Sequence, residues 1–177
     1  DWVDGWKDHF RPILIGAVRI RPPWEEPVAS GELMDVVINP GLGFGTGLHP
    51  TTRGTLELLQ GDTVGGRLLD AGTGSGVLSI AAAKLGWGPI VAFDNDPVAL
   101  ISARENVDVN GVAGVVTLLE AAVTDVRPEW TAGATVLANM TLEPVLALLA
   151  RLRDLERDGA AAPAGRPRRL VVSGILA

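Results

Sequence analysis

Three polar features of this chain have the types and spacing that a ligand with a ribose requires. The segment Asp70 to Gly76 reads Asp-Ala-Gly-Thr-Gly-Ser-Gly, and Asp94 and Asn139 each close a short apolar run. Glycine lets the backbone come close to a ligand and adopt positive φ angles. Asp94 stands 22 residues after Gly72, and a carboxylate there can accept two hydrogen bonds from a ribose diol. The combination of turn and acid therefore predicts a site for a ligand that contains a ribose.

Two other glycine motifs fit this turn less well. The dinucleotide fingerprint has glycines at relative positions one, three and six, which here are Gly72, Gly74 and Val77. The third glycine is missing, and the glycines lie instead at 72, 74 and 76. No Lys followed by Ser or Thr comes after the turn, so it is not a phosphate-binding P-loop. A nicotinamide-dependent oxidoreductase stays the less favoured alternative.

Apolar periodicity predicts the elements that must position these residues. Asp96 followed by Pro97 predicts a helix start, with an N-cap and then proline at the first helical position. The expected strands are 17–21, 34–38, a short strand led by 68–69, 90–93, 115–119, 135–138 and 170–174; the expected helices are one ending near 60, then 77–85, 97–109 and one through 145–155.

From Arg67 onward, strands and helices alternate with short turns. This order implies an α/β fold with a doubly wound, mostly parallel, Rossmann-like sheet that is covered on both faces. Ligands of such sheets bind beyond the carboxyl ends of the strands, at the topological switch point. We therefore expect the glycine turn, Asp94 and Asn139 to meet at one edge of the sheet.

Composition excludes several kinds of function. The chain has 177 residues, of which 47% are apolar, and this is enough for one domain with a sizeable core. It contains no cysteine, which excludes disulfides, thiolate metal sites and a cysteine nucleophile. Its net charge of −6 argues against direct nucleic-acid binding and favours a basic partner. We expect no metal, no membrane association and a cytoplasmic location.

The two ends of the chain and one loop lead to further expectations. Residues 1–30 contain Trp2, Trp6, Phe10 and Trp24, and we interpret them as a strap packed on the following domain, with an aromatic contact surface as the alternative. Residues 31–177 form the expected catalytic domain, and because the chain stops directly after an apolar run we interpret it as truncated, either a fragment of a longer protein or an incomplete gene model. The low-complexity segment 159–169 is expected to be a connection, with a partner contact as the alternative.

The segment from Asn39 to Thr52 carries the most specific pattern, Asn-Pro-Gly-Leu-Gly-Phe-Gly-Thr-Gly-Leu-His-Pro-Thr-Thr. It resembles the signature of the bacterial methyltransferases that act on ribosomal protein L-eleven of the large subunit. The glycine turn is likewise similar to the nucleoside-binding turn of class I S-adenosylmethionine-dependent methyltransferases. The resemblance continues through 69–82, 94–97, 103–112 and 137–139, and also through 6–12, 21–24 and 173–176, so that it covers nearly the whole chain except 159–169. It implies that the last two strands of the methyltransferase sheet are missing.

This resemblance implies an enzyme that moves a methyl group from S-adenosylmethionine to lysine or α-amino groups of a basic ribosomal protein. Thr52 is expected to reach the cofactor, the glycine turn to hold its methionyl part and Asp94 to hold its ribose. Asn139 is expected to be the catalytic residue at the methyl-transfer end. The full set of implied cofactor-binding residues is Phe44, Thr46, Thr52, Asp70, Gly72, Gly74, Gly76, Asp94 and Asn139.

Some roles and alternatives stay open at this point. His49 is expected to brace its loop rather than to act as a base, and Glu120 is expected near the adenine. Asn139 is followed by Met140 rather than by the Pro-Pro-aromatic run of glutamine and adenine N-methyltransferases, which argues against a planar amide or base as acceptor. The alternatives are a different protein or small-molecule amine as acceptor, and a binding module without catalysis.

Overall fold

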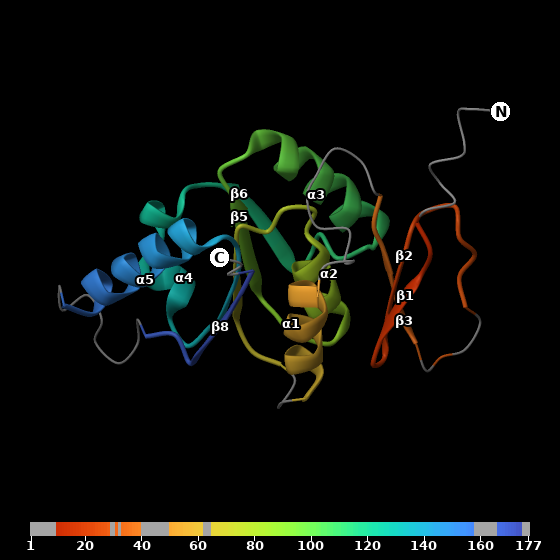
Figure 1. The fold of residues 1–177 in the computed structure, drawn as a ribbon, viewed down its shortest axis with the longest axis horizontal. Helices are drawn as coiled ribbons and strands as arrows, with labels where there is room; N and C mark the ends of the chain where they lie inside the picture. Colours follow the sequence, from red (N-terminus) through yellow and green to blue (C-terminus); the bar gives the residue numbers. More distant parts are fainter. Residues whose placement is uncertain are drawn as a thin grey trace.

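The computed structural model describes residues 10–28, 31, 33–39, 50–61, 65–157 and 166–174. These residues form a three-stranded and a five-stranded sheet with helices between them and beyond them (Figure 1). In chain order the elements are β1 (Ile13–Ile15), β2 (Val18–Arg21), β3 (Met34–Val37), α1 (Pro50–Gly61), β4 (Leu68–Ala71), α2 (Val77–Lys84), β5 (Ile90–Asp94), α3 (Pro97–Val109), β6 (Val116–Glu120), a 3-10 turn (Val123–Asp125), α4 (Pro128–Thr131), β7 (Thr135–Asn139), α5 (Leu142–Arg157) and β8 (Arg169–Ser173).

The five-stranded sheet has the order β6-β5-β4-β7-β8, and all its strands are parallel. The chain begins this sheet at β4, adds strands on one side and then crosses to the other side, so the expected doubly wound sheet is confirmed. Ala71, the last residue of β4, pairs with Phe93 of β5 and with Ala138 of β7. The residues that follow these three, namely Gly72, Asp94 and Asn139, therefore lie side by side at the carboxyl ends of the strands.

The helices cover the two faces of this sheet in two groups. Helices α1, α2 and α3 lie on the side toward the three-stranded sheet, whereas α4 and α5 lie on the opposite side (Figure 1). α2 is buried over residues 77–82, where its alanines let two layers approach closely. α5 is amphipathic, because only its stripe Val145, Leu148, Leu152 and Leu155 is buried. Two apolar clusters, one on each face, hold the layers together.

Helix α3 begins as its sequence predicts. The Asp96 side chain accepts a hydrogen bond from the Val98 backbone at 2.8 Å, and Pro97 occupies the first helical position. An aspartate N-cap satisfies one of the backbone donors that a helix start leaves without partners. Because this cap follows β5 directly, it fixes the helix against the end of the strand that carries Asp94.

The three-stranded sheet joins segments on both sides of residue 30. β1 pairs antiparallel with β2, and β2 pairs in parallel with β3. Arg19 and Asp35 are cross-strand partners, and the Asp35 carboxylate lies 3.1 Å from Arg19 and 2.8 Å from Arg21. Burial tends to raise the pKa of Asp35, but the two guanidinium groups outweigh it and hold the pKa below 3.8. The division of the chain at residue 30 stays a prediction.

The aromatic residues of the amino-terminal segment are described only in part. Trp2 and Trp6 lie outside the described residues, Phe10 is half-buried and Trp24 is 37% exposed. Among the helices that the structure describes, none combines the length and the apolar character needed to cross a membrane.

Candidate active site

The glycine turn follows β4, whose four residues are all buried. The backbone amides of Gly72 and Thr73 both donate to the Phe93 carbonyl of β5, at 2.9 and 3.0 Å, and the Gly76 amide donates to the Thr73 carbonyl at 3.0 Å. Gly72, Gly74 and Gly76 have φ angles of +69°, +56° and +81°. Residues that carry a side chain rarely adopt such backbone angles, so the shape of this turn depends on glycine.

A side chain on Gly72 would collide with the side chain of Met140, which would have to move. A Cβ atom built on Gly72 would be 2.5 Å from the Met140 sulfur and 2.6 Å from the Met140 Cγ. Met140 comes directly after β7, so the turn and the end of that strand are in contact at this point. The Met140 side chain thus packs directly against the Gly72 backbone.

Asp70, at the base of the turn, is almost fully buried, with 1% of its surface exposed. Its Oδ2 atom accepts hydrogen bonds from Thr73 at 2.8 Å and from Ser79 at 2.6 Å. Burial raises the pKa of the Asp70 carboxyl, and the two hydroxyl donors only partly oppose this. The carboxyl therefore connects β4, the turn and α2 through one oxygen.

We expect the stability of the protein to report the raised pKa of Asp70. A carboxyl whose pKa rises on folding binds its proton more tightly in the folded state, so acid favours the folded state. The free energy of unfolding of the wild type should therefore increase, relative to that of Asp70→Asn, as the pH falls from 7 toward 3.8, the ordinary pKa of aspartate. Urea unfolding of both proteins at neutral pH and at about pH 4 measures this difference, and a pH-independent difference would contradict the expectation.

Asp94 ends β5 and is half-buried. Its Oδ2 accepts from the Gly74 amide at 2.9 Å, and its Oδ1 accepts from the Asp96 amide at 3.0 Å. Each carboxylate oxygen can accept a further hydrogen bond, so both keep capacity for an external donor. Glu120, the cross-strand partner of Asp94 at the end of β6, is exposed.

Asn139 ends β7 and is held from two sides. Its amide nitrogen donates to the Thr52 hydroxyl of α1 at 3.2 Å, and its amide oxygen accepts from the Ser173 hydroxyl of β8 at 3.0 Å. The Ser173 oxygen lies 2.9 Å from the Thr55 hydroxyl, one helical turn after Thr52. These contacts orient the Asn139 side chain at the carboxyl edge of the sheet.

The structure brings several of the expected site residues to this edge. The glycine turn contacts Asp94 through Gly74 and the end of β7 through Gly72, and Asn139 contacts Thr52. Phe44, Thr46 and His49 lie outside the described residues, so the structure gives no position for them. The cofactor-binding and catalytic roles of all these residues stay predictions.

Sequence reasoning missed Ser173 and Thr55 as neighbours of Asn139. Ser173 is the register partner of Asn139, one strand further along the sheet, so the rule that located Asn139 at a strand end could also have found Ser173. Thr55 carries no comparable sequence signal, because its contact with Ser173 joins residues 118 positions apart.

The carboxylate of Asp94 and the backbone of the glycine turn lie next to each other at this edge. Asp94 offers the acceptors that ribose hydroxyls require, and the glycine turn offers backbone without side chains. Within the described ranges, no group of three or more His, Cys, Asp or Glu residues could hold a metal ion.

Known proteins are similar to this chain along its whole length. The model of the family described as ribosomal protein L11 methyltransferase (PrmA) matches residues 1–177. The ribosomal protein L11 methyltransferase of Citrifermentans bemidjiense is 45% identical over 185 residues, which cover 99% of this chain and 56% of that protein. The one from Geobacter metallireducens is 42% identical, with 99% and 55% covered. The chain thus spans a little over half the length of these relatives.

A solved structure shows the same arrangement. The ribosomal protein L11 methylase from Lactobacillus delbrueckii subsp. bulgaricus matches with a TM-score of 0.70 and 26% identity, over 94% of this chain and 81% of that one. Family, relatives and fold agree with the methyltransferase resemblance, and none of them supports the oxidoreductase alternative. The chain belongs to the ribosomal protein L11 methyltransferase family, whose fold is that of the class I methyltransferases.

Proposed function

We propose that this chain binds S-adenosylmethionine at the glycine turn and carries the methyl-transferring part of a protein N-methyltransferase. The proposed acceptors are lysine or α-amino groups of ribosomal protein L11, a basic protein in the cytoplasm, without direct contact to nucleic acid. The observation that carries the proposal is the meeting of Asp94, bare glycine backbone and Asn139 at one edge of the sheet. The names of the relatives support the choice of acceptor.

In this proposal, each residue at the sheet edge contacts a different part of the cofactor. Asp94 accepts hydrogen bonds from the ribose hydroxyls, and the glycine turn lies against the methionyl part. Thr52 reaches the cofactor from α1, while Glu120 lies near the adenine. When bound, S-adenosylmethionine supplies an electrophilic methyl group on a sulfonium, and positioning of the acceptor nitrogen therefore provides most of the rate.

The proton of the acceptor amine is the main chemical difficulty. A lysine with a pKa of about 10.4 costs about 4–5 kcal/mol to deprotonate at pH 7, whereas an α-amine with a pKa of about 8 costs about 1 kcal/mol. Desolvation lowers the pKa of an amine. The neutral amide oxygen of Asn139 can accept a hydrogen bond from the N–H of the acceptor amine. It forms no salt bridge, which would stabilise the protonated ammonium form. Its contacts with Thr52 and Ser173 keep the amide in place for this task.

Asp94→Ala is expected to raise the dissociation constant for S-adenosylmethionine by about 100-fold, because two hydrogen bonds to a charged acceptor are lost. Asp96→Ala is the matched control, since the side chain of this neighbouring aspartate caps α3 and the substitution keeps the backbone amide that donates to Asp94. The control should lose about 1 kcal/mol of stability and little affinity. Calorimetric titration measures both constants, and an equal loss of affinity in the two variants would refute the role of Asp94.

The activity is tested with S-adenosylmethionine that carries a labelled methyl group. The 177-residue chain is incubated with ribosomal protein L11, with an unrelated basic protein and with small primary amines, and the labelled product is located by mass spectrometry. We expect label on amino groups of L11. Label on another acceptor alone would favour a different substrate for the same core, and the absence of label on every acceptor would contradict the proposal for this chain.

A further inference from the structure

Strand β3 is paired along one edge by a strand and along the other by side chains. The amides of Met34 and Ile38 donate to carbonyls of the β2 segment, Ala17 and Arg21, at 2.7 and 2.9 Å. Alternate residues of a strand direct their backbone groups to opposite edges, so Asp35, Val37 and Asn39 face away from β2. Helices rather than a further strand lie on that side (Figure 1).

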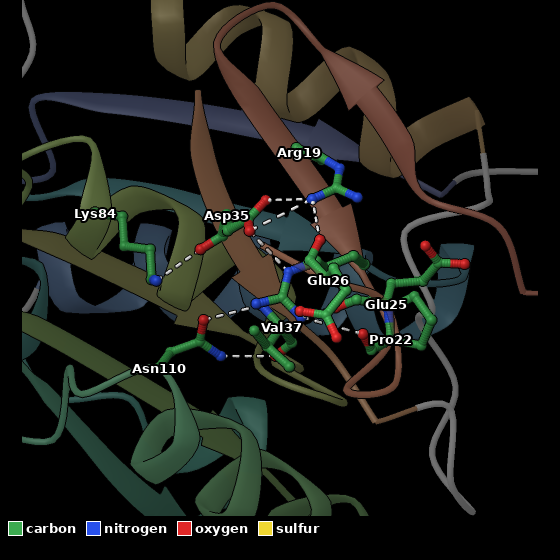
Figure 2. A network of polar contacts seen from close by, with 9 residues as sticks. Arg19, Pro22, Glu25, Glu26, Asp35, Val37, Lys84 and Asn110 are labelled. Atoms are coloured by element: carbon green, nitrogen blue, oxygen red, sulfur yellow. Dashed lines mark hydrogen bonds and ion pairs between the residues drawn. The ribbon is translucent and has the colours of Figure 1, made fainter. Parts of the chain in front are cut away.

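Three side chains meet this second edge: Lys84 of α2, Asn106 of α3 and Asn110, the C-cap of α3. Lys84 donates to the Asp35 carbonyl at 2.6 Å, and Asn110 makes a reciprocal pair with the Val37 backbone, at 2.9 and 2.6 Å. Figure 2 shows both side chains reaching the strand from the same side. Asn106 continues the series, because its amide oxygen accepts from the Asn39 amide at 2.9 Å.

Asn106 differs from the other two because it also contacts the glycine turn. Its amide nitrogen donates to the Ser75 carbonyl, in the middle of the glycine turn, at 2.9 Å. The side chain is fully buried, with 0% of its surface exposed. One amide therefore joins the glycine turn to Asn39, the residue at which the signature segment begins in the sequence.

Asparagine suits position 106 because one side chain must both accept from the Asn39 amide and donate to the Ser75 carbonyl. Asparagine carries an acceptor and a donor on one short planar group, whereas aspartate at neutral pH has acceptors only. Asparagine is also a poor residue for the interior of a helix, so packing of α3 alone does not favour it. Without the amide, the Asn39 N–H and the Ser75 C=O would each lose a buried partner.

We propose that Asn106 is a positioning residue of the cofactor site, which sets the glycine turn against the end of β3 by bonding to both. This inference rests on the proposed binding of S-adenosylmethionine. It assigns Asn106 an effect on the part of the ligand that the turn faces, the methionyl part, and not on the nucleoside that Asp94 holds.

The test compares two ligands and three variants. S-adenosylmethionine contains the methionyl part, and 5′-methylthioadenosine lacks it but keeps the nucleoside. Asn106→Ala removes both contacts, while Asn106→Asp keeps the acceptor for Asn39 and loses the donor to Ser75. Asn110→Ala is the control, because it removes two contacts to β3 and one to the Asn106 backbone carbonyl, but none to the glycine turn.

We expect both Asn106 variants to raise the dissociation constant for S-adenosylmethionine about tenfold and that for 5′-methylthioadenosine less than about twofold, by calorimetry. The Asn110 variant should leave the ratio of the two constants unchanged. Amide hydrogen exchange at Gly74 and Gly76, whose amides donate within the site, should quicken in the Asn106 variants only. Should Asn106→Ala fail to fold, Asn106→Asp keeps the size of the side chain and carries the test.

The outcomes distinguish a failure of the inference from a failure of the proposed function. If the Asn106 variants raise the dissociation constants of both ligands equally, Asn106 is only structural and the inference is wrong. The same holds if Asn110→Ala changes the ratio of the two dissociation constants as much. If the wild-type chain binds neither ligand, the proposed function fails for this chain. Hydrogen exchange then still tests whether Asn106 holds the glycine turn in place. Equal exchange rates at the Gly74 amide in the Asn106 and Asn110 variants would show that it does not.

Discussion

Asn139→Ala is expected to slow methyl transfer by at least about 100-fold while changing the dissociation constant for S-adenosylmethionine by less than about threefold. In the proposed mechanism the Asn139 oxygen holds the acceptor nitrogen, an interaction that matters mainly in the transition state. Thr52 and Ser173 already orient the side chain, so the Asn139 side chain loses little conformational entropy when the acceptor binds. Single-turnover assays give the rate, and calorimetry gives the affinity.

Asn139→Asp is the informative second variant, because it keeps the shape and changes the charge. A carboxylate beside the amine stabilises the ammonium and raises its pKa. The rate should therefore be low at pH 7 and should recover only at a higher pH than in the wild type. A parallel fall of rate and cofactor affinity in Asn139→Ala would show that Asn139 serves binding and not the transfer step.

Gly72→Ala is expected to abolish measurable binding of S-adenosylmethionine and to lower the stability of the fold. The added Cβ would lie 2.5 Å from the Met140 sulfur, in a backbone with a φ of +69° that alanine rarely adopts. The positive φ alone costs about 1–2 kcal/mol, and the collision must move either Met140 or the turn. Because the turn also donates to Phe93 and Asp94, its displacement should disturb the whole site.

Gly111→Ala is the matched control for this variant. Gly111 has the same φ of +69°, but no atom lies within 4 Å of the position that its Cβ would occupy. It should therefore show the conformational cost without loss of affinity. Adding Met140→Ala to Gly72→Ala should restore part of the stability. Thermal unfolding and calorimetry measure these effects, and wild-type affinity in Gly72→Ala would refute close contact between turn and ligand.

The main elements could be predicted because their signals are local. The N-cap at Asp96, the proline after it and the apolar runs of β5 and β7 each lie within a few neighbouring residues. The sequence did not reveal β1, which has three residues, or the short helix α4, because so few residues establish no periodicity. Parallel pairing of β2 with β3 was also missed, since it depends on contacts between segments separated in the chain.

The convergence of the site residues follows from the geometry of parallel sheets. Strand ends meet at one edge, so the glycine turn, Asp94 and Asn139 could be grouped before any coordinates were known. Their partners could not be grouped in the same way. The contact from Asn139 to Thr52 spans 87 positions, and the contact from Asn39 to Asn106 spans 67, and neither pair shares a motif. The available signal was Asn106 inside α3, together with Asn110 at its C-cap four residues later, because asparagine is unfavourable in a helix interior.

The glycine turn is the shared centre of these contacts. It meets Asp94 through Gly74, Asn106 through Ser75, and the end of β7 through Gly72. A cofactor that lies on this turn would therefore be positioned relative to the methyl-transfer end by short, direct contacts. This arrangement explains why both large predicted effects, at Gly72 and at Asn139, concern neighbouring parts of one edge.

Calorimetric titration of the 177-residue chain with S-adenosylmethionine, and with NAD as the competing cofactor, tests whether the glycine turn, Asp94 and Asn139 form a methyltransferase cofactor site. We expect binding of S-adenosylmethionine with one site per chain and no detectable binding of NAD. Binding of NAD in preference to S-adenosylmethionine would contradict the methyltransferase assignment of the glycine turn, and binding of neither would contradict the claim that these residues form a competent cofactor site.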